Sequence, residues 1–242
     1  MSDVAQQRAA PVDPYADPAT LARLGMLVRQ RLRSIPGVEQ VDAKGADMFV
    51  VPGFLTRKDC ADIVKVINQR AVPSTIYRGK ESSENFRTSY THHFARDDPL
   101  TQSIESYISD LIGIADTFSE TMQGQRYKVG QEFRHHHDFF YTNSDYWQFE
   151  RTHGGQRSWT AMVNLNEPRE GGETDFPQLG IRVRPKTGTL VLWNNMDANG
   201  HPNPRTLHAG LPVLRGIKHV ITKWYRQEPW RLLNTDSSAR DA

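Results

Sequence analysis

The chain has 242 residues, of which 37% are hydrophobic and 24% charged, so it is long enough for one large domain or two small ones. Its net charge is only +2 and its basic residues are spread along the chain, which argues against nucleic-acid binding, because that function needs a concentrated basic face. The single cysteine, Cys60, excludes an intramolecular disulfide and favours a reducing compartment.

The sequence contains no apolar run that approaches the ~18 residues of a membrane span. Its N-terminus also lacks the apolar segment of a secretory signal. We therefore expect a soluble, cytoplasmic protein with neither a membrane nor a nucleic acid as its partner.

The N-terminal half predicts helices. Residues 1–16 are polar and contain prolines, and we expect a flexible arm there. Asp17-Pro18 then supplies a helix N-cap followed by proline at the first helical position, and apolar residues at helical spacing continue to Pro36-Gly37. Thr56 caps a second predicted amphipathic helix, and Asp98-Pro99 opens a third.

From about Gln123 the sequence changes to short β-rich runs separated by glycine, proline and asparagine. Such a series is typical of an all-β sandwich or barrel. The predicted strands cover residues 126–129, 132–141, 158–165, 181–183, 189–193 and 217–225. We predict a single domain over residues 17–232, with helical support at about 17–122 packed on a β core at about 123–226, and a flexible tail at 233–242.

The segment Phe133-Arg134-His135-His136-His137-Asp138 carries the clearest chemistry. On a strand, side chains two positions apart share a face, so His136 and Asp138 point one way and His135 and His137 the other. A histidine and a carboxylate on one face supply two ligands of a 2-His-1-carboxylate site, which is typical of non-heme Fe(II). The face of His135 and His137 lacks a carboxylate, so we expect those two at the surface or behind the ligands.

The third ligand has to come from elsewhere in the fold. We choose His208, because it leads into a β-rich run and precedes Lys218 by about one hairpin. Lys218 shares a strand face with Val220 and Thr222, and a lysine that faces a barrel interior needs an anionic partner such as a carboxylate cosubstrate. The alternative for Lys218 is an exposed edge strand. The histidines passed over are His92, His93, His153, His201 and His219.

Three further segments have structural and functional interpretations. Gly171 to Pro177 contains two acidic residues, but we favour a tight turn that leads into a strand, because glycine permits unusual backbone angles. Trp224 lies on the same alternating face as Lys218 and is placed to line a cavity. The polar segments 78–85 and 143–156 are predicted surface loops that order as lids on substrate binding.

Together these residues resemble prolyl 4-hydroxylases, within the Fe(II)/2-oxoglutarate dioxygenase superfamily. The resemblance covers roughly residues 48–226 and implies an α+β fold with a mainly β core, a double-stranded β-helix (jelly roll, cupin-like) with N-terminal helices packed on one sheet. The motifs that carry it, in order, are Phe54-Leu55, Arg87-Thr88-Ser89, Tyr127 to Phe140, Thr160, Gly171 to Pro177, Pro185-Lys186-Thr187-Gly188, Pro204 to Gly210, Pro212-Val213 and Gly216-Ile217-Lys218.

The resemblance also implies the chemistry of the site. It implies 2-oxoglutarate as cosubstrate, with its far carboxylate paired with Lys218 and hydrogen-bonded by Tyr127 and Thr160, and O2 as oxidant, with ascorbate as a reductant. It places Arg157 and Trp224 beside the substrate groove. The residues that it implies for iron are His136, Asp138 and His208.

The sequence departs from the family pattern outside this metal set, which bears on the substrate rather than on oxygen activation. Hydroxylation of a peptidyl proline is the leading hypothesis. Hydroxylation of a free amino acid or another small molecule is the second, and a non-catalytic metal-binding β-barrel sensor is the third. The departures are Phe133 in place of a common Tyr near the substrate, His135 for Pro, His137 for an aromatic, Asn164 for Tyr and His219 for Trp.

Overall fold

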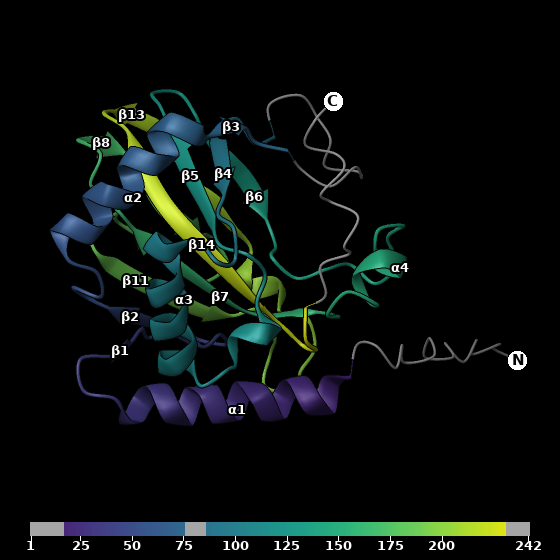
Figure 1. Cartoon of the computed structure of the whole chain (residues 1–242). Coiled ribbons are helices and arrows are strands. Elements are labelled where there is room, and N and C mark those ends of the chain that lie inside the picture. The colour runs from purple at the N-terminus through teal and green to yellow at the C-terminus, as the bar shows by residue number, and fades with distance from the viewer. Residues whose placement is uncertain (1–16, 76–85, 231–242) are drawn as a thin grey trace, which may run out of the picture.

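The computed structural model describes residues 17–75 and 86–230 (Figure 1). The arm predicted at 1–16, the loop predicted at 78–85 and the tail predicted at 233–242 lie outside these ranges. Within them the helices are α1 (Pro18–Ser34), α2 (Arg57–Arg70), α3 (Pro99–Ile112) and the short α4 (Trp147–Glu150). None of the described helices is long and apolar enough to cross a membrane.

The three long helices begin where the sequence predicts. The carboxylate of Asp17 accepts the N–H of Ala19 at 3.0 Å, and that of Asp98 accepts the N–H of Leu100 at 2.9 Å. At α2, Thr56 and Asp59 form a reciprocal capping box. Each cap satisfies an N–H group that the helix leaves without a partner, which is worth about 1 kcal/mol.

Eight antiparallel strands form the larger sheet, in the order β1-β2-β11-β7-β14-β5-β4-β3. The central strands β7 and β14 are buried on both faces. The two-residue strands β1 and β3 at the edges were not predicted. The bounds are β1 (Glu39–Gln40), β2 (Met48–Val51), β11 (Thr189–Asn194), β7 (Arg157–Asn164), β14 (Lys218–Arg226), β5 (Gln123–Tyr127), β4 (Tyr90–His93) and β3 (Val72–Pro73).

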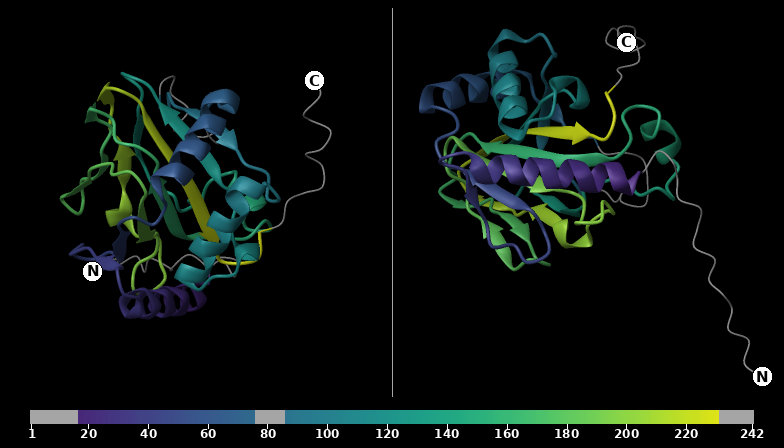
Figure 2. Two further views of the ribbon diagram at one scale, coloured as in Figure 1. Left: turned by 60° about the vertical axis from the view of Figure 1, so that its left-hand side comes forward. Right: turned by 90° about the horizontal axis from the view of Figure 1, so that it is seen from below.

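A smaller antiparallel sheet has the order β10-β9-β12-β6, and a further pair joins β13 to β8. Helices α2 and α3 cover one face of the larger sheet, and the smaller sheet lies on the other side (Figure 2). The predicted arrangement, helices packed on one sheet of a mainly β core, is therefore confirmed. The bounds are β10 (Ile181–Val183), β9 (Thr174–Phe176), β12 (His208–Gly210), β6 (Phe133–His136), β13 (Val213–Arg215) and β8 (Glu170–Gly171).

The alternation of β7 shows how the sheet divides its two faces. Trp159, Ala161 and Val163 pack into the core beneath the helices. Thr160 and Met162 point the other way, into the space between the two sheets. The functional side chains lie in this second space.

The strand predicted at 132–141 is shorter than expected. β6 ends at His136, and the chain bends before Phe140. The side chain of Gln156 then accepts the N–H of Phe140 at 2.8 Å and donates to its carbonyl at 2.6 Å, so an amide side chain replaces the partner strand. The glycine turn prediction is confirmed, since Gly171 and Gly172 have φ angles of +73° and +76° and lead into β9.

Candidate metal centre and cosubstrate cavity

His136 and His208 are neighbours across two strands. The last residue of β6, His136, is in register with the first residue of β12, His208, and their rings are 4.3 Å apart between centroids. Asp138 brings Oδ1 to 3.7 Å from Nε2 of His136 and Oδ2 to 3.8 Å from Nε2 of His208. The three ligand atoms lie within 4.8 Å of one another, and all three residues are buried. The predicted triad therefore converges.

The protonation states suit a metal ion. Nδ1–H of His136 donates to the carbonyl of Arg134 at 2.7 Å, and Nδ1–H of His208 donates to that of Thr206 at 2.9 Å. In this tautomer the Nε2 atom of each ring carries a lone pair that can bind a metal ion. Burial, followed by the nearby His208, holds the pKa of His136 well below its usual value. Burial alone would raise the pKa of Asp138, but His208 and His136 outweigh it and the pKa lies below normal.

Two imidazoles and one carboxylate are the ligand set of a divalent transition ion, which binds such ligands in their deprotonated forms. Among the residues that the structure describes, no other group of three His, Cys, Asp or Glu side chains converges in this way.

A cavity opens beside the triad and contains Lys218. This side chain is only 2% exposed, and its Nζ lies 3.4 Å from Oγ1 of Thr174 and 5.4 Å from the ring centroid of Tyr127. Burial lowers the pKa of Lys218 to about 8. The predicted interior position of Lys218 is confirmed, and Tyr127, Phe133 and Trp224 line the same cavity.

The structure corrects the role expected for Thr160. Its hydroxyl donates to Oδ2 of Asp138 at 2.7 Å, so its one proton serves the metal ligand rather than a cosubstrate carboxylate. The hydroxyl beside Lys218 belongs instead to Thr174, which sequence reasoning missed. Thr174 follows the glycine turn and begins β9, so only the pairing of β9 with β12 shows which way it points.

Arg157 lies over the ring of Trp224, which lines the cavity, and belongs to a network of charges. Its guanidinium donates to both carboxylate oxygens of Glu120, at 2.5 and 2.6 Å, and lies 4.3 Å from the ring centroid of Trp224. Arg226, which is 1% exposed, joins Glu120 at 2.7 Å to Glu150 at 2.6 Å. The resemblance placed Arg157 beside the groove but gave no indication of Glu120 or Glu150.

The positions that depart from the family pattern differ in their distance from the triad. Phe133 stacks on His136 with ring centroids 3.6 Å apart. Asn164 is buried, and neither of its amide atoms has a hydrogen-bond partner among the described residues. His219 bonds Asn68 at 3.0 Å on the helix side of the sheet, and burial lowers its pKa to about 4.

His135 and His137 point away from the ligands, as predicted. Nε2 of His135 lies 3.6 Å from Oδ2 of Asp175. The ring of His137 lies between the hydroxyl of Tyr141, at 2.8 Å, and the carbonyl of Pro204, at 3.1 Å. Neither belongs to the cluster of metal-ligating groups.

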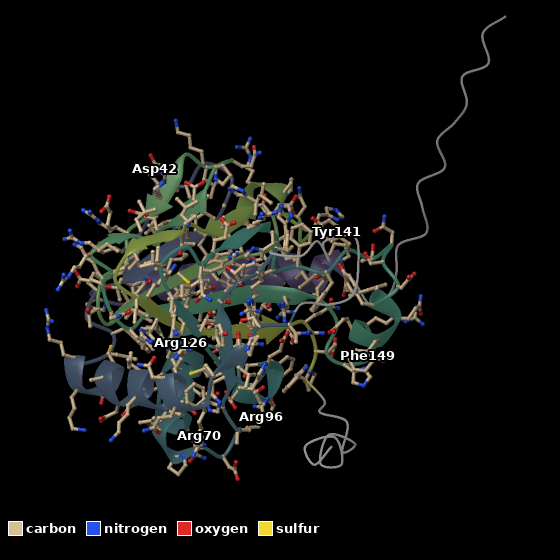
Figure 3. The ribbon with its side chains drawn as sticks, turned by 90° about the horizontal axis from the view of Figure 1, so that it is seen from above. Asp42, Arg70, Arg96, Arg126, Tyr141 and Phe149 are labelled. Carbon is tan, nitrogen blue, oxygen red and sulfur yellow. The ribbon has the colours of Figure 1, made fainter. Side chains whose placement is uncertain are left out.

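The segment 143–156, predicted as a lid, contains α4 and projects from the sheets (Figures 1 and 3). Tyr141 and Phe149, labelled in Figure 3, are exposed. The C-terminal half of the segment is bound to the core through Glu150 and through the pair of Gln156 with Phe140. Closure of this segment over the cavity stays a prediction.

Known proteins share this architecture. The model of the 2OG-Fe(II) oxygenase superfamily matches residues 122–226. Prolyl 4-hydroxylase 1 of Arabidopsis thaliana is 32% identical over 200 residues, which cover 75% of this chain and 69% of that relative. The probable prolyl 4-hydroxylase 3 of the same plant is 30% identical over 73% of this chain and 68% of its own length.

Solved structures of prolyl hydroxylases are also similar to this chain. The viral collagen prolyl hydroxylase of Paramecium Bursaria Chlorella virus-1, in its 2OG complex, matches with a TM-score of 0.59 and 28% identity over 77% of this chain and 99% of that one. A prolyl hydroxylase of Trichoplax adhaerens, solved with a peptide fragment of hypoxia inducible factor, has a TM-score of 0.59 at 18% identity and covers 86% and 90% of the two chains. These likenesses confirm the double-stranded β-helix core.

Proposed function

Because the chain belongs to the prolyl 4-hydroxylase-like members of the 2OG-Fe(II) oxygenase superfamily, we propose that it hydroxylates a peptidyl proline. The observation that carries this proposal is that a candidate metal site and a buried cation line the same cavity. The triad of His136, Asp138 and His208 supplies a metal site, and the ammonium of Lys218 supplies a countercharge for an acidic cosubstrate.

The metal ligands in this proposal are Nε2 of His136, Nε2 of His208 and the carboxylate of Asp138. When bound, Fe(II) and 2-oxoglutarate supply the oxidising chemistry, in which O2, 2-oxoglutarate and a C–H group become succinate, CO2 and C–OH. We further propose ascorbate as the reductant that maintains activity. The protein's own residues bind and orient, since the reaction requires no side-chain nucleophile.

Lys218 and Thr174 hold the far carboxylate of 2-oxoglutarate. A buried cation is costly without a partner, so this carboxylate restores the charge balance of the cavity. Tyr127 lies beneath the ammonium and shapes the same end of the cavity. The hydroxyl of Thr174 adds a donor within reach of the same anion.

The substrate side is formed by Arg157, Trp224 and Phe133. Glu120 and Trp224 fix the guanidinium of Arg157, while the indole Nε1–H of Trp224 is buried and has no hydrogen-bond partner among the described residues. A peptide carbonyl is a suitable acceptor for that donor. The prolyl hydroxylases among the relatives support a peptide substrate.

A free amino acid or another small molecule is the second candidate. It is favoured by Phe133, which stacks on His136 and presents an apolar ring where the family commonly has a tyrosine hydroxyl. A non-catalytic sensor is disfavoured, because a binder of metal alone has no need of Lys218 in the same cavity.

The test is substrate-dependent turnover of 2-oxoglutarate. The protein is incubated with Fe(II), 2-oxoglutarate and ascorbate, and with either a proline-rich peptide or free proline; succinate is quantified and the added oxygen atom is located by mass spectrometry. We expect peptide-stimulated succinate release and hydroxyproline in the peptide, neither of which Asp138→Ala should produce. Oxidation of free proline alone would transfer the assignment to the second candidate.

We also propose that the enzyme works in the cytoplasm. The burial of its only cysteine, Cys60, on the apolar side of α2 is compatible with a reducing compartment. Fractionation of the cells that express it, with immunodetection of the protein, tests this location.

A further inference from the structure

The carboxylate of Asp138 is hydrogen-bonded to a residue of the larger sheet, which is itself hydrogen-bonded to a second buried residue. Oγ1 of Thr160, on β7, lies 2.7 Å from Oδ2 of Asp138. Nδ2 of Asn195, the residue that follows β11, lies 2.9 Å from the same Oγ1. Thr160 and Asn195 are both 0% exposed, so water does not compete for these bonds. The three side chains form one chain of hydrogen bonds that ends on a metal ligand.

The direction of both bonds follows from the proton inventory. An ionised carboxylate can only accept, and a threonine hydroxyl has one proton to give. Thr160 therefore donates to Asp138, and its oxygen accepts from the NH2 group of Asn195. The backbone of Asn195 is fixed on both sides, because its N–H donates to Ser158 and its carbonyl accepts from Asn203, at 2.7 and 2.9 Å. The orientation of the hydroxyl is thus determined by the sheet.

This arrangement makes the two oxygens of Asp138 unequal. Oδ2 accepts the proton of Thr160, whereas Oδ1, which lies 3.7 Å from Nε2 of His136, accepts no hydrogen bond from the described residues. We infer that Thr160, oriented by Asn195, is a positioning residue that occupies Oδ2 and leaves Oδ1 as the single carboxylate ligand of the ion. The inference rests on the metal site of the proposed function.

The consequence concerns the coordination positions that remain open. Three protein ligand atoms leave three of the six positions of an octahedral ion for cosubstrate and O2. A carboxylate that bound through both oxygens would take one of those three. Thr160 and Asn195 thereby protect a position that the reaction needs, although neither touches the ion.

The test measures the metal site directly, without turnover. Metal-free protein is titrated with Co(II), and the dissociation constant and the visible spectrum are recorded, because the spectrum of this ion changes with its coordination number. The variants are Thr160→Val, which keeps the shape and removes the hydroxyl, and Thr160→Ser, which restores the hydroxyl. Thr101→Val is the matched control, since Thr101 is a buried threonine on α3 whose hydroxyl has no partner among the described residues.

Loss of an outer partner of a metal ligand typically weakens affinity about 10- to 100-fold, and we expect a loss of that size with an altered Co(II) spectrum in Thr160→Val. Thr160→Ser and Thr101→Val should retain the wild-type affinity and spectrum. Asn195→Ala should also weaken Co(II) affinity, but by less. Thermal unfolding of the metal-free protein will show whether Thr160→Val folds. If it does not fold, Asn195→Ala serves as the second variant.

Two results would overturn the inference, and they are distinguishable. Equal Co(II) affinity and equal spectra in wild type, Thr160→Val and Asn195→Ala would remove the positioning role while leaving the metal site intact. Failure of the wild-type protein to bind Co(II) would remove the metal site itself, and with it both the inference and the proposed function.

Discussion

Nζ of Lys218 lies 3.4 Å from Oγ1 of Thr174, and no carboxylate of the described residues forms an ion pair with it. An ammonium that is 2% exposed and has no carboxylate at ion-pair distance is destabilised by desolvation, and the negative charge of Glu173 offsets this effect only in part. This is why the pKa of Lys218 falls from 10.5 to about 8. The same feature that suits the residue to an anionic ligand therefore makes its charge sensitive to pH.

We predict that the affinity for 2-oxoglutarate declines above pH 8. The carboxylate binds the charged amine, and the free protein loses that charge as the pH rises through about 8. Each pH unit well above this pKa should weaken binding about tenfold, whereas binding should be constant below it. Calorimetric titration of Co(II)-loaded protein measures the effect without turnover. Lys218→Met should bind weakly at every pH, and the same alkaline decline in that variant would contradict the assignment.

The second prediction concerns the metal ligands. His136→Ala, Asp138→Ala and His208→Ala should each abolish stoichiometric Co(II) binding and turnover, because two ligands cannot hold the ion at the same affinity. His135→Ala is the matched control, since this neighbouring imidazole faces Asp175 and not the cavity. Equilibrium dialysis with metal analysis reads the outcome, and Co(II) retention by Asp138→Ala would contradict the site.

The pairing of His136 with His208 illustrates what sequence alone can and cannot supply. The spacing of His136 and Asp138 is local, so strand alternation places them on one face even though the strand ends before Asp138. The register of β6 with β12 joins residues far apart in sequence, and the choice of His208 depended on its setting beside Lys218 and on a family resemblance. Local periodicity carries no information on such pairings.

Thr160 and Glu120 show the same limit. The resemblance assigned Thr160 to the cosubstrate, but its hydroxyl contacts Asp138, whose position depends on the bend that follows β6. Glu120 lies between a 3-10 turn and β5, where no periodic pattern exists, and its partners Arg157 and Arg226 are 37 and 106 residues away. Both contacts join segments far apart in the sequence, so they become visible only in the folded structure.

The third prediction follows from Glu120. Its carboxylate lies between the guanidinium groups of Arg157 and Arg226. The side chains of these two arginines are 13% and 1% exposed. Removing one partner of a buried ionic group typically costs about 3–5 kcal/mol, so Glu120→Gln should lower the free energy of unfolding by roughly that amount. Urea denaturation measures it. Asp62→Asn, which breaks the exposed pair with Lys58, is the control and should change stability little.

The network of Glu120 also has a defined pH dependence. Burial alone would raise the pKa of Glu120, but Arg157 and Arg226 outweigh it and hold the pKa below 4.5. A depressed folded-state pKa contributes stability that is fully present above the unfolded value of 4.5 and is lost as the pH falls through the folded value. The acid decline in stability should therefore be shallower in Glu120→Gln, and parallel profiles for wild type and variant would show that this carboxylate is not the titrating group.

The last prediction separates backbone strain from steric exclusion at two glycines. Gly188 has φ +75°, and a Cβ there would lie 2.2 Å from the carbonyl oxygen of Leu55, the residue just before the cap of α2. Gly180 has φ +65°, but nothing lies within 4 Å of its Cβ position. Both substitutions to alanine incur the left-handed penalty of about 1–2 kcal/mol.

Gly188→Ala must in addition displace the backbone at Leu55, whose N–H donates to the carbonyl of Gly188 at 3.1 Å. Overpacking typically adds about 1–3 kcal/mol, so we expect this variant to lose roughly twice the stability that Gly180→Ala loses. Urea unfolding of the two variants provides the comparison. Equal losses would mean that the segment before α2 moves freely relative to β11, and the close approach at Gly188 would then not fix the helix against the sheet.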